Sequence, residues 1–263
     1  MNEVVDKALR GMALLSVRNI RHWTDRTFSF RCERPAGFRF RSGEFAMIGL
    51  MVEGKPLLRA YSIASPAWDE ELEFYSIKVE DGPLTSRLRN LAEGERIVMR
   101  PKPVGTLVHD ALNPGRRLFL FSTGTGIAPF ASVIRDPETY EKFEQVVLTQ
   151  TCRQVAELDY GRDLVARIAA DELLSEMVGD KLTLIATTTR EQSPAMGRMT
   201  DWIRDGRLAA ATGAPLNPET DRVMICGSMA MLQEHKAICE ELGFIEGSNS
   251  APGQFVIEKA FVD

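Results

Sequence analysis

The chain has 263 residues, 44% of them hydrophobic, and a formal net charge of -5 at pH 7. This length and hydrophobic content suffice for two domains of ordinary size, each with a buried core. The chain has no basic tract and no run of about 18 apolar residues, so we expect neither a nucleic-acid-binding protein nor a membrane-inserted one.

The cysteines and histidines give no sign of a metal site. The four cysteines form no CxxC pair or cluster, and the three histidines belong to no HExxH motif. A G-x-S-x-G motif, which would supply a serine nucleophile, is also missing. The N-terminal residues lack the apolar segment of a secretion signal. We therefore expect a cytoplasmic protein without metal that is not a hydrolase.

The first half of the chain has the pattern of short β-strands separated by Gly, Pro and Asp clusters. The alternation in Thr27-Phe28-Ser29-Phe30 and the regular spacing of the segments predict an antiparallel barrel. One helix is expected over residues 85–91. The predicted strands cover residues 14–20, 27–32, 45–50, 72–79 and 96–100.

Two segments of this half have the chemistry that a flavin nucleotide requires. Arg59-Ala60-Tyr61-Ser62 offers a guanidinium for phosphate, an aromatic ring for a fused ring system and a hydroxyl for a ring nitrogen. Gly82-Pro83 opens the expected helix, where free backbone N–H groups can bind a diphosphate. The first segment allows FMN or FAD, and the second favours FAD because it accommodates a second phosphate.

After Asn113-Pro114-Gly115 the pattern changes to apolar strands that alternate with helical stretches. This pattern predicts a parallel sheet wound on both faces, which binds nucleotides at the carboxyl ends of its strands. We place the domain boundary here, with one domain over residues 1–114 and a second over residues 115–263. The predicted strands cover residues 118–122, 146–150, 182–187, 223–226 and 255–258.

A glycine-rich loop, Gly124-Thr125-Gly126-Ile127-Ala128-Pro129, follows the first of these strands. Its glycines allow a ligand to approach the backbone, and its proline stands where a helix would begin. A plain tight turn explains the pattern about as well by itself, but the strand–turn–helix context favours phosphate binding. The loop lacks Gly-Lys-Ser/Thr and so is not a Walker loop.

Two arginines indicate which second nucleotide is bound. Arg190 ends Thr187-Thr188-Thr189-Arg190 after the third parallel strand, and Arg198 follows shortly afterwards. Arginines at this position suit the 2'-phosphate of NADP, whereas NAD sites use a carboxylate there. Glu191 weakens this inference, and two solvated surface arginines are the alternative.

Cys226 and Glu258 are candidates for chemistry in the same crevice. Cys226 ends the fourth parallel strand, and Glu258 stands among apolar neighbours in the last one. A cysteine at a strand end is more often a packing residue, and an exposed edge carboxylate is the alternative for Glu258.

The chain resembles ferredoxin (flavodoxin)–NADP reductases, of the bacterial branch rather than the plastid one. The resemblance extends over nearly the whole chain. The matching segments occur in family order: Arg59-Ala60-Tyr61-Ser62, Ser76-Ile77-Lys78-Val79, Gly82-Pro83-Leu84-Thr85-Ser86, Lys102-Pro103-Val104-Gly105-Thr106-Leu107, Gly124-Thr125-Gly126-Ile127-Ala128-Pro129-Phe130, Thr187-Thr188-Thr189-Arg190, Cys226-Gly227-Ser228 and Glu258-Lys259-Ala260-Phe261.

The resemblance implies an N-terminal Greek-key β-barrel that binds FAD and a C-terminal doubly wound α/β domain that binds NADP. Arg59 would hold FAD phosphate, Tyr61 would stack on the isoalloxazine, and Ser62 would hydrogen-bond the flavin nitrogen that takes the hydride. Leu84, Thr85 and Ser86 would cradle the diphosphate. The other implied FAD contacts are Ala60, Ser76, Ile77, Lys78 and Thr125.

The second domain would bind NADP, and the resemblance also implies the catalytic residues. Cys226 and Glu258 would lie near the hydride path and act together with Ser62. The implied NADP contacts are Gly124, Gly126, Pro129, Cys152, Arg153, Thr189, Arg190, Arg198, Gly227, Ser228 and Met229.

The C-terminus departs from the plastid members of the family. They end in a tyrosine that covers the flavin face where nicotinamide must arrive, whereas this chain has Ala260 there and continues through Phe261-Val262-Asp263. The small Ala260 leaves that face less shielded. The tail would then fold along the FAD, with Phe261 against the adenine.

The expected protein is a monomeric flavoenzyme that exchanges electrons between NADPH and the one-electron carriers ferredoxin or flavodoxin. These carriers are typically acidic, so a basic rim should steer them to the flavin. The alternatives are an NAD(P)H flavin or oxygenase reductase, a diaphorase and a non-catalytic electron-transfer subunit. The rim candidates, each ordinarily just a solvated charge, are Arg39, Arg41, Lys55, Lys102 and Arg116.

Overall fold

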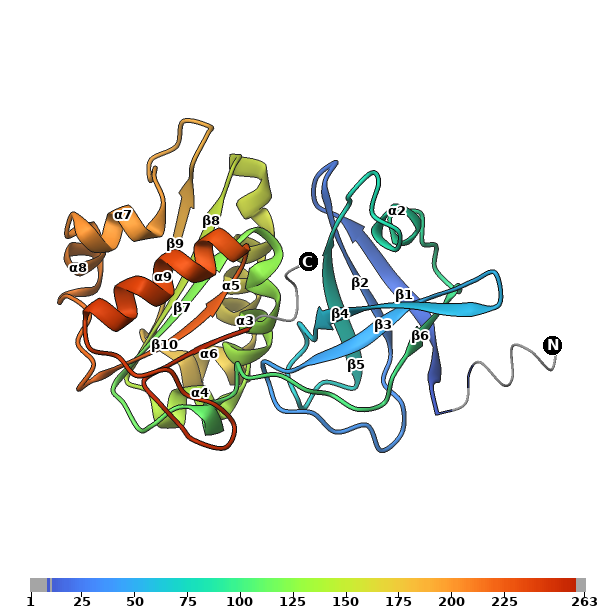
Figure 1. Cartoon of the computed structure of the whole chain (residues 1–263), viewed down its shortest axis with the longest axis horizontal. Helices are drawn as coiled ribbons and strands as arrows, with labels where there is room; N and C mark the ends of the chain where they lie inside the picture. Colours follow the sequence, from blue (N-terminus) through green and yellow to red (C-terminus); the bar gives the residue numbers. More distant parts are fainter. Residues whose placement is uncertain (1–8, 10, 259–263) are drawn as a thin grey trace.

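A computed structural model describes residue 9 and residues 11–258 of the chain. Two domains lie side by side, one built on an antiparallel sheet and the other on a parallel sheet covered by helices (Figure 1). The prediction of a two-domain β plus α/β fold is therefore confirmed.

The first domain is a six-stranded antiparallel sheet in the described residues, in the order β4-β3-β6-β1-β2-β5. The order is that of a Greek key, because β6 returns over a long connection to lie between β3 and β1. A short helix, α2 (Thr85–Leu88), precedes β6. The strands are β1 (Ala13–His22), β2 (Thr27–Glu33), β3 (Phe45–Val52), β4 (Lys55–Ser62), β5 (Glu71–Ile77) and β6 (Arg96–Met99).

The sequence pattern missed strand β4, although this strand contains the Arg59-Ala60-Tyr61-Ser62 segment. It pairs in register with β3 and lies at one end of the sheet order. Edge strands tolerate proline and partly exposed side chains, and β4 has Pro56 and an exposed Arg59. Its pattern of burial therefore lacks the alternation that identified the other strands.

Alternation along β2 places its aromatic side chains in the core, as predicted. Phe28 and Phe30 are fully buried and pack with Phe74 of β5. On the other face of the same strand, Ser29 accepts a hydrogen bond from Trp23 Nε1 at 2.9 Å. The outer face is therefore buried near Trp23, at Thr27 and Ser29, and is partly exposed further along the strand, at Arg31 and Glu33.

The second domain is a five-stranded parallel sheet in the described residues, in the order β11-β10-β7-β8-β9. The strand order reverses direction between β7 and β10, which makes the carboxyl ends of these two strands the expected nucleotide site. The strands are β7 (Arg117–Thr123), β8 (Gln145–Cys152), β9 (Leu182–Thr188), β10 (Asp221–Cys226) and β11 (Phe255–Ile257).

Helices cover both faces of this sheet (Figure 1). Strand β7 shows why: Leu118 and Leu120 belong to the core on one face, and Phe119 and Phe121 belong to the core on the other. The helices α3 to α6 supply the first core and α7 to α9 the second. They are α3 (Ala128–Val133), α4 (Pro137–Lys142), α5 (Asp159–Ala170), α6 (Glu172–Val178), α7 (Met199–Arg204), α8 (Arg207–Thr212) and α9 (Met229–Glu241).

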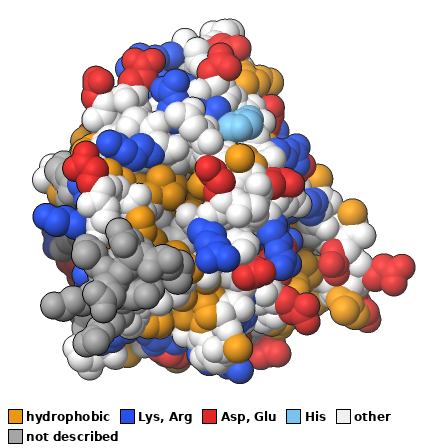
Figure 2. Space-filling view, turned by 90° about the vertical axis from the view of Figure 1, so that its right-hand side faces the viewer, with side chains coloured by type: hydrophobic (Ala, Val, Ile, Leu, Met, Phe, Trp, Pro, Cys, Tyr) orange, Lys and Arg blue, Asp and Glu red, His pale blue; other side chains and the backbone are white. Residues whose placement is uncertain are grey.

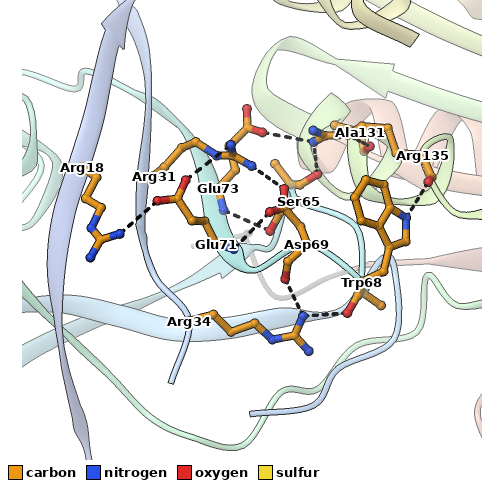
Figure 3. Close-up of polar contacts among 12 residues, drawn as sticks. Arg18, Arg31, Arg34, Ser65, Trp68, Asp69, Glu71, Glu73, Ala131 and Arg135 are labelled. Atoms are coloured by element: carbon orange, nitrogen blue, oxygen red, sulfur yellow. Dashed lines mark hydrogen bonds and ion pairs between the residues drawn. The ribbon is translucent and has the colours of Figure 1, made fainter. Parts of the chain in front are cut away.

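A buried polar network joins the two domains (Figure 3). Arg135, which follows α3, forms an ion pair with Glu73 of β5 at 3.1 Å, and both side chains are at most 10% exposed. The indole of Trp68 donates a hydrogen bond to Arg135 O at 3.0 Å. Next to this network, the rings of Tyr75 (β5) and Tyr160 (α5) stack at 4.0 Å. The domain interface is therefore packed and hydrogen-bonded.

Candidate nucleotide-binding cleft

A cleft of about 940 Å3 lies between the domains. One wall comes from β4, β5 and the segment before α2, and the other from the ends of β7, β8 and β10 and the loops that follow them. The predicted flavin segment and the predicted phosphate loop thus line the same cavity. A volume of this size is at the upper end of the range for small-molecule sites.

Arg59 and Tyr61 face the cleft from strand β4. The Arg59 side chain is exposed, donates a hydrogen bond to Leu58 O at 2.9 Å, and has no carboxylate partner among the described residues. The hydroxyls of Tyr61 and Ser76 are 3.0 Å apart, and the ring of Phe74 meets the Tyr61 ring edge-on. Burial raises the pKa of Tyr61. Its orientation is therefore fixed at both the hydroxyl and the ring.

The segment before α2 offers backbone donors to the cleft. Leu84 and Thr85 line the cavity, and their N–H groups donate no hydrogen bond within the described part of the chain. Ser86, in contrast, donates its N–H to Gly82 O at 3.0 Å and does not line the cavity. A Cβ at Gly82 would lie 2.1 Å from Thr85 Oγ1, so a side chain there would force this hydroxyl to turn away. The donors that face the cleft are thus Leu84 and Thr85.

The glycine-rich loop forms a 3₁₀ turn over Gly124–Ile127 directly after β7, followed by α3 with Pro129 in its first turn. Gly124 has a φ of +54°, in the left-handed region that favours glycine. Gly126 is required for another reason: a Cβ at this position would lie 2.3 Å from Cys226 O at the end of β10. The loop approaches the end of β10 closely because position 126 is glycine, whereas Gly124 serves the backbone conformation of the turn.

Three arginines line the second-domain side of the cleft. Arg153 and Arg190 are exposed and have no carboxylate partner among the described residues. Arg198 forms an ion pair with Glu234 of α9 at 3.0 Å. The loops that contain Arg153 and Arg190 are held together, since Arg190 N–H donates to Arg153 O at 3.2 Å. This cationic cluster suits an anionic group such as phosphate.

Cys226 and Glu258 lie near each other, but only Cys226 lines the cleft. Cys226 lines the cavity with only 2% of its surface exposed, and burial, together with the Glu258 charge, raises the pKa of its thiol. The Glu258 carboxylate accepts a hydrogen bond from Thr106 N–H at 3.1 Å. It is buried but does not belong to the cavity lining. Cys226 is therefore a neutral thiol, and Glu258 is held by the segment that connects the domains.

The structure brings most of the predicted contacts together. The cleft is lined by Arg59, Ala60, Tyr61, Ser62, Ser76, Ile77, Leu84, Thr85, Gly124, Thr125, Gly126, Cys152, Arg153, Thr189, Arg190, Arg198, Cys226, Gly227 and Ser228. The predicted residues that do not line it are Lys78, Ser86, Pro129, Met229 and Glu258. The Lys78 ammonium instead donates to Thr24 O at 3.2 Å. Ala260 and Phe261 lie outside the described residues.

Several lining residues escaped the reasoning from sequence, notably Arg26, Tyr75, Glu234 and His235. The last two could have been found, because helical periodicity from Ala230 and Met231 places residues 234 and 235 on the same face of α9. Tyr75 and Arg26 had no such signal.

The basic rim expected for a carrier protein is partly neutralised. Arg41 pairs with Glu44 and Asp110, and Arg116 pairs with Glu144. Figure 2 shows positive and negative side chains interspersed over the outer face of the first domain. In the described part of the chain there is no group of three potential metal ligands and no helix long and apolar enough to cross a membrane.

Family models match both halves of the chain. The model described as an oxidoreductase FAD-binding domain matches residues 12–109, and the one described as an oxidoreductase NAD-binding domain matches residues 120–237. A flavodoxin/ferredoxin–NADP reductase of Rhodobacter capsulatus is 59% identical over 249 residues, which are 94% of this chain and 92% of the relative. The chain belongs to the ferredoxin–NADP reductase family.

Other members of the reductase family support this assignment. A ferredoxin–NADP reductase of Pseudomonas aeruginosa is 50% identical over 94% of this chain and 96% of the relative. A crystal structure of a ferredoxin NADP+ reductase from Neisseria gonorrhoeae, with bound FAD and NADP, superposes with a TM-score of 0.86 at 26% identity, covering 95% of this chain and 99% of that one. The predicted resemblance to the bacterial reductases is therefore confirmed, and this reductase is an oxidoreductase with an FAD-binding and an NADP-binding domain.

Proposed function

We propose that the cleft binds FAD on its first-domain wall and NADP(H) on its second-domain wall, so that the chain exchanges electrons between NADPH and ferredoxin or flavodoxin. The observation that carries this proposal is that a phosphate- and ring-binding set on β4 and a cationic set after β8 and β9 line one cleft. The division of roles follows the sheets, with residues 1–114 for FAD and residues 115–263 for NADP.

The donor groups on the first-domain wall fit FAD. Arg59 is a cation without a carboxylate partner among the described residues, and the N–H groups of Leu84 and Thr85 are free to bind a second phosphate. Tyr61 offers a flat ring whose orientation is fixed by Ser76. Ser62, Ala60 and Ile77 complete the wall where the ring system would lie.

The groups on the second-domain wall fit NADP in preference to NAD. Arg153, Arg190 and Arg198 supply three guanidinium groups in the cleft, as a 2'-phosphate requires. Gly124 and Gly126 allow a diphosphate close to the backbone, next to Gly227 and Ser228 of the neighbouring strand end. The loops after β8 and β9, which include Arg153 and Arg190, are joined where Thr189 N–H donates to Cys152 O at 2.9 Å.

The protein side chains position the reactants and control protons. Bound FAD would supply the redox chemistry, accepting two electrons together as hydride and releasing them singly. Ser62 would donate a hydrogen bond to the reacting edge of the ring. Because its pKa is raised, Cys226 stays a neutral thiol that packs beside the reacting centre and does not act as a nucleophile. Glu258, held by Thr106, would keep a carboxylate near this centre.

We also propose that the enzyme acts as a monomer in the cytoplasm and that the carrier protein docks at the first domain. One chain supplies both walls of the cleft, and the four cysteines are buried and free, as in a reducing compartment. Of the five rim candidates, the exposed Arg39, Lys55 and Lys102 have no carboxylate partner in the described residues, so they are the stronger sites for steering.

The test uses the purified protein's visible spectrum and its response to NADPH in the absence of air. A yellow protein that NADPH bleaches, and that then reduces ferredoxin or flavodoxin, supports the proposal. A protein without flavin absorbance would overturn it. An equal response to NADH and NADPH would reject the role given to the three arginines. Reduction of a dye but of neither carrier protein would indicate a diaphorase instead.

A further inference from the structure

The buried guanidinium of Arg135 donates hydrogen bonds to both domains. It donates to Ala131 O in its own domain at 2.8 Å, and across the interface to Ala64 O at 2.5 Å and to Glu73 Oε2 at 3.1 Å (Figure 3). Burial disfavours the charge on Glu73, but the positive charges of Arg135, Arg167 and Arg31, with the hydrogen bond from Arg135, together outweigh this effect and lower the pKa of Glu73. The two charges therefore compensate each other within a buried interface.

The same interface includes a second contact to Glu73. The hydroxyl of Tyr160, which lies in the first turn of α5, donates to Glu73 Oε1 at 3.1 Å. Glu73 thus uses one carboxylate oxygen for Arg135 and the other for Tyr160. Both partners come from the second domain, Arg135 from the end of α3 and Tyr160 from the start of α5. Because the two contacts are separate, the Glu73 carboxylate fixes the rotation of one domain relative to the other as well as their separation.

These contacts connect directly to the walls of the cleft. Ala64, which Arg135 holds, comes two residues after Ser62, and its N–H pairs with Glu73 O at 2.8 Å. Tyr75, two residues after Glu73 on the same face of β5, lines the cleft and stacks on Tyr160 with an interplanar angle of 7°. On the opposite wall, α5 begins directly after the segment 152–157, which includes Cys152, Arg153 and Glu157 of the lining.

We propose that Glu73 is a positioning residue for electron transfer: with Arg135 and Tyr160 it fixes the angle between the domains, and hence the approach of the two ring systems in the cleft. This inference rests on the proposed function. Neither Glu73 nor Tyr160 lines the cavity, so they act through Tyr75 and Ala64 and not by touching a ligand. The transfer of a hydride is steeply sensitive to such positioning, since a misplacement of about 1 Å can cost roughly 100-fold in rate.

The test compares two variants, Tyr160→Phe and Glu73→Gln, with the wild-type holoprotein and a matched control, Tyr140→Phe. Tyr140 is buried like Tyr160, and its hydroxyl also donates one hydrogen bond, to Ile134 O at 2.7 Å. That bond lies wholly within the second domain. Tyr160→Phe keeps the ring stacked on Tyr75 and removes only the bond across the interface. Four quantities are measured: melting temperature, NADP+ affinity, the limiting rate of flavin reduction by NADPH, and reoxidation of the flavin by a small dye.

We expect Tyr160→Phe and Tyr140→Phe to lose similar thermal stability, but only Tyr160→Phe and Glu73→Gln to lower the limiting rate of flavin reduction, by about tenfold. NADP+ affinity and reoxidation by the dye should stay at the wild-type level, because each depends on one wall alone. Glu73→Gln removes the charge that pairs with Arg135, and Tyr160→Phe removes the bond to the other carboxylate oxygen. Because both contacts meet at one side chain, the double variant should lose less rate than the product of the two single losses.

Equal rates of flavin reduction in Tyr160→Phe and Tyr140→Phe would overturn the inference and leave Glu73 a purely structural residue. A parallel loss of dye reoxidation would also overturn it, because the defect would then lie at the flavin wall. A wild-type protein that holds no flavin, or that NADPH does not bleach, is a different result: it would overturn the proposed function itself.

Discussion

Arg198 and Glu234 form an ion pair at the edge of the cleft, with Arg198 Nη1 and Glu234 Oε1 3.0 Å apart. Glu234 also lies 3.5 Å from the hydroxyl of Thr200. Among the three arginines proposed to bind the 2'-phosphate, Arg198 alone has a carboxylate partner in the described residues. A phosphate that binds here must displace this carboxylate or tolerate its charge.

The first prediction concerns this ion pair. Glu234→Gln should lower the KM for NADPH by roughly threefold to tenfold, because it frees Arg198 and removes a negative charge near the phosphate. The KM for NADH, which has no 2'-phosphate, should change little. Steady-state kinetics with both nucleotides measure the effect. Glu241→Gln, an exposed position on the same helix, controls for net charge, and an equal effect of the two substitutions would contradict the prediction.

The second prediction concerns the hydroxyl pair of Tyr61 and Ser76, which are 3.0 Å apart. Tyr61→Phe should weaken FAD binding by about 1 kcal/mol, the usual contribution of one hydrogen bond. Tyr61→Ala should cost about 1–3 kcal/mol more, because it also removes the ring on which the flavin would stack. Fluorescence titration of the apoprotein with FAD measures both values. Ser29→Ala, which affects a hydroxyl elsewhere in the barrel, should leave FAD affinity unchanged.

The third prediction distinguishes two reasons why a position requires glycine, close packing against the backbone and a positive φ. Gly126→Ala should destabilise the fold by on the order of 3 kcal/mol, because its Cβ would meet the backbone of Cys226 at 2.3 Å and β10 cannot move aside. In Gly213→Ala the new Cβ would face open space. The only cost is then the backbone strain of a non-glycine residue at a φ of +87°, about 1–2 kcal/mol. Urea unfolding of both variants gives the comparison, and similar losses would show that the close approach at Gly126 is tolerated.

The fourth prediction concerns pH and the buried His235. Its Nδ1–H donates to Met231 O at 2.9 Å, and burial lowers the pKa of the ring to about 4. The folded state therefore binds the proton less readily than the unfolded chain, whose histidine titrates near 6.5. The resulting stabilisation, on the order of 3 kcal/mol, is complete above pH 6.5 and is lost as the pH falls towards 4.

Melting temperatures measured between pH 7 and about 4.5 test the role of His235. His235→Leu should show a shallower fall in melting temperature over this interval than the wild type does. Burial also lowers the pKa of His109, so part of the slope should remain in the variant. Partial burial and the charge of Lys78 lower the pKa of the exposed His22 as well, so this residue also contributes to the remaining slope. A slope that His235→Leu leaves unchanged would contradict the assignment.

Sequence reasoning succeeded where the signal is local. The glycine-rich loop after β7 and the Cys226-Gly227-Ser228 segment after β10 each follow a recognisable strand, and the topology of a doubly wound sheet then brings them to one edge. Arg59 and Tyr61 were identified by their chemistry even though the strand on which they lie was not predicted.

It failed where function depends on partners that are distant in the sequence. Glu73 and Arg135 are 62 residues apart, and neither has a neighbourhood that distinguishes it from an ordinary solvated charge. Tyr75 and Tyr160 likewise look like core aromatics until the two domains are placed together. Lys78 was predicted to contact FAD because it lies in a segment that matches the reductase family. Its ammonium instead donates a hydrogen bond to Thr24 O and does not face the cleft.

The Glu73–Arg135 pair also limits how freely the two halves of such enzymes can be exchanged. A chimaera that joins the first domain of this chain to the second domain of a relative inherits a buried carboxylate, and without an arginine at the matching position that charge would cost about 3–5 kcal/mol. Flavin and nucleotide preferences can thus be recombined only between parents that share this cross-domain pair. Compatibility at one buried contact, which does not line the cleft, therefore affects the stability of every such hybrid.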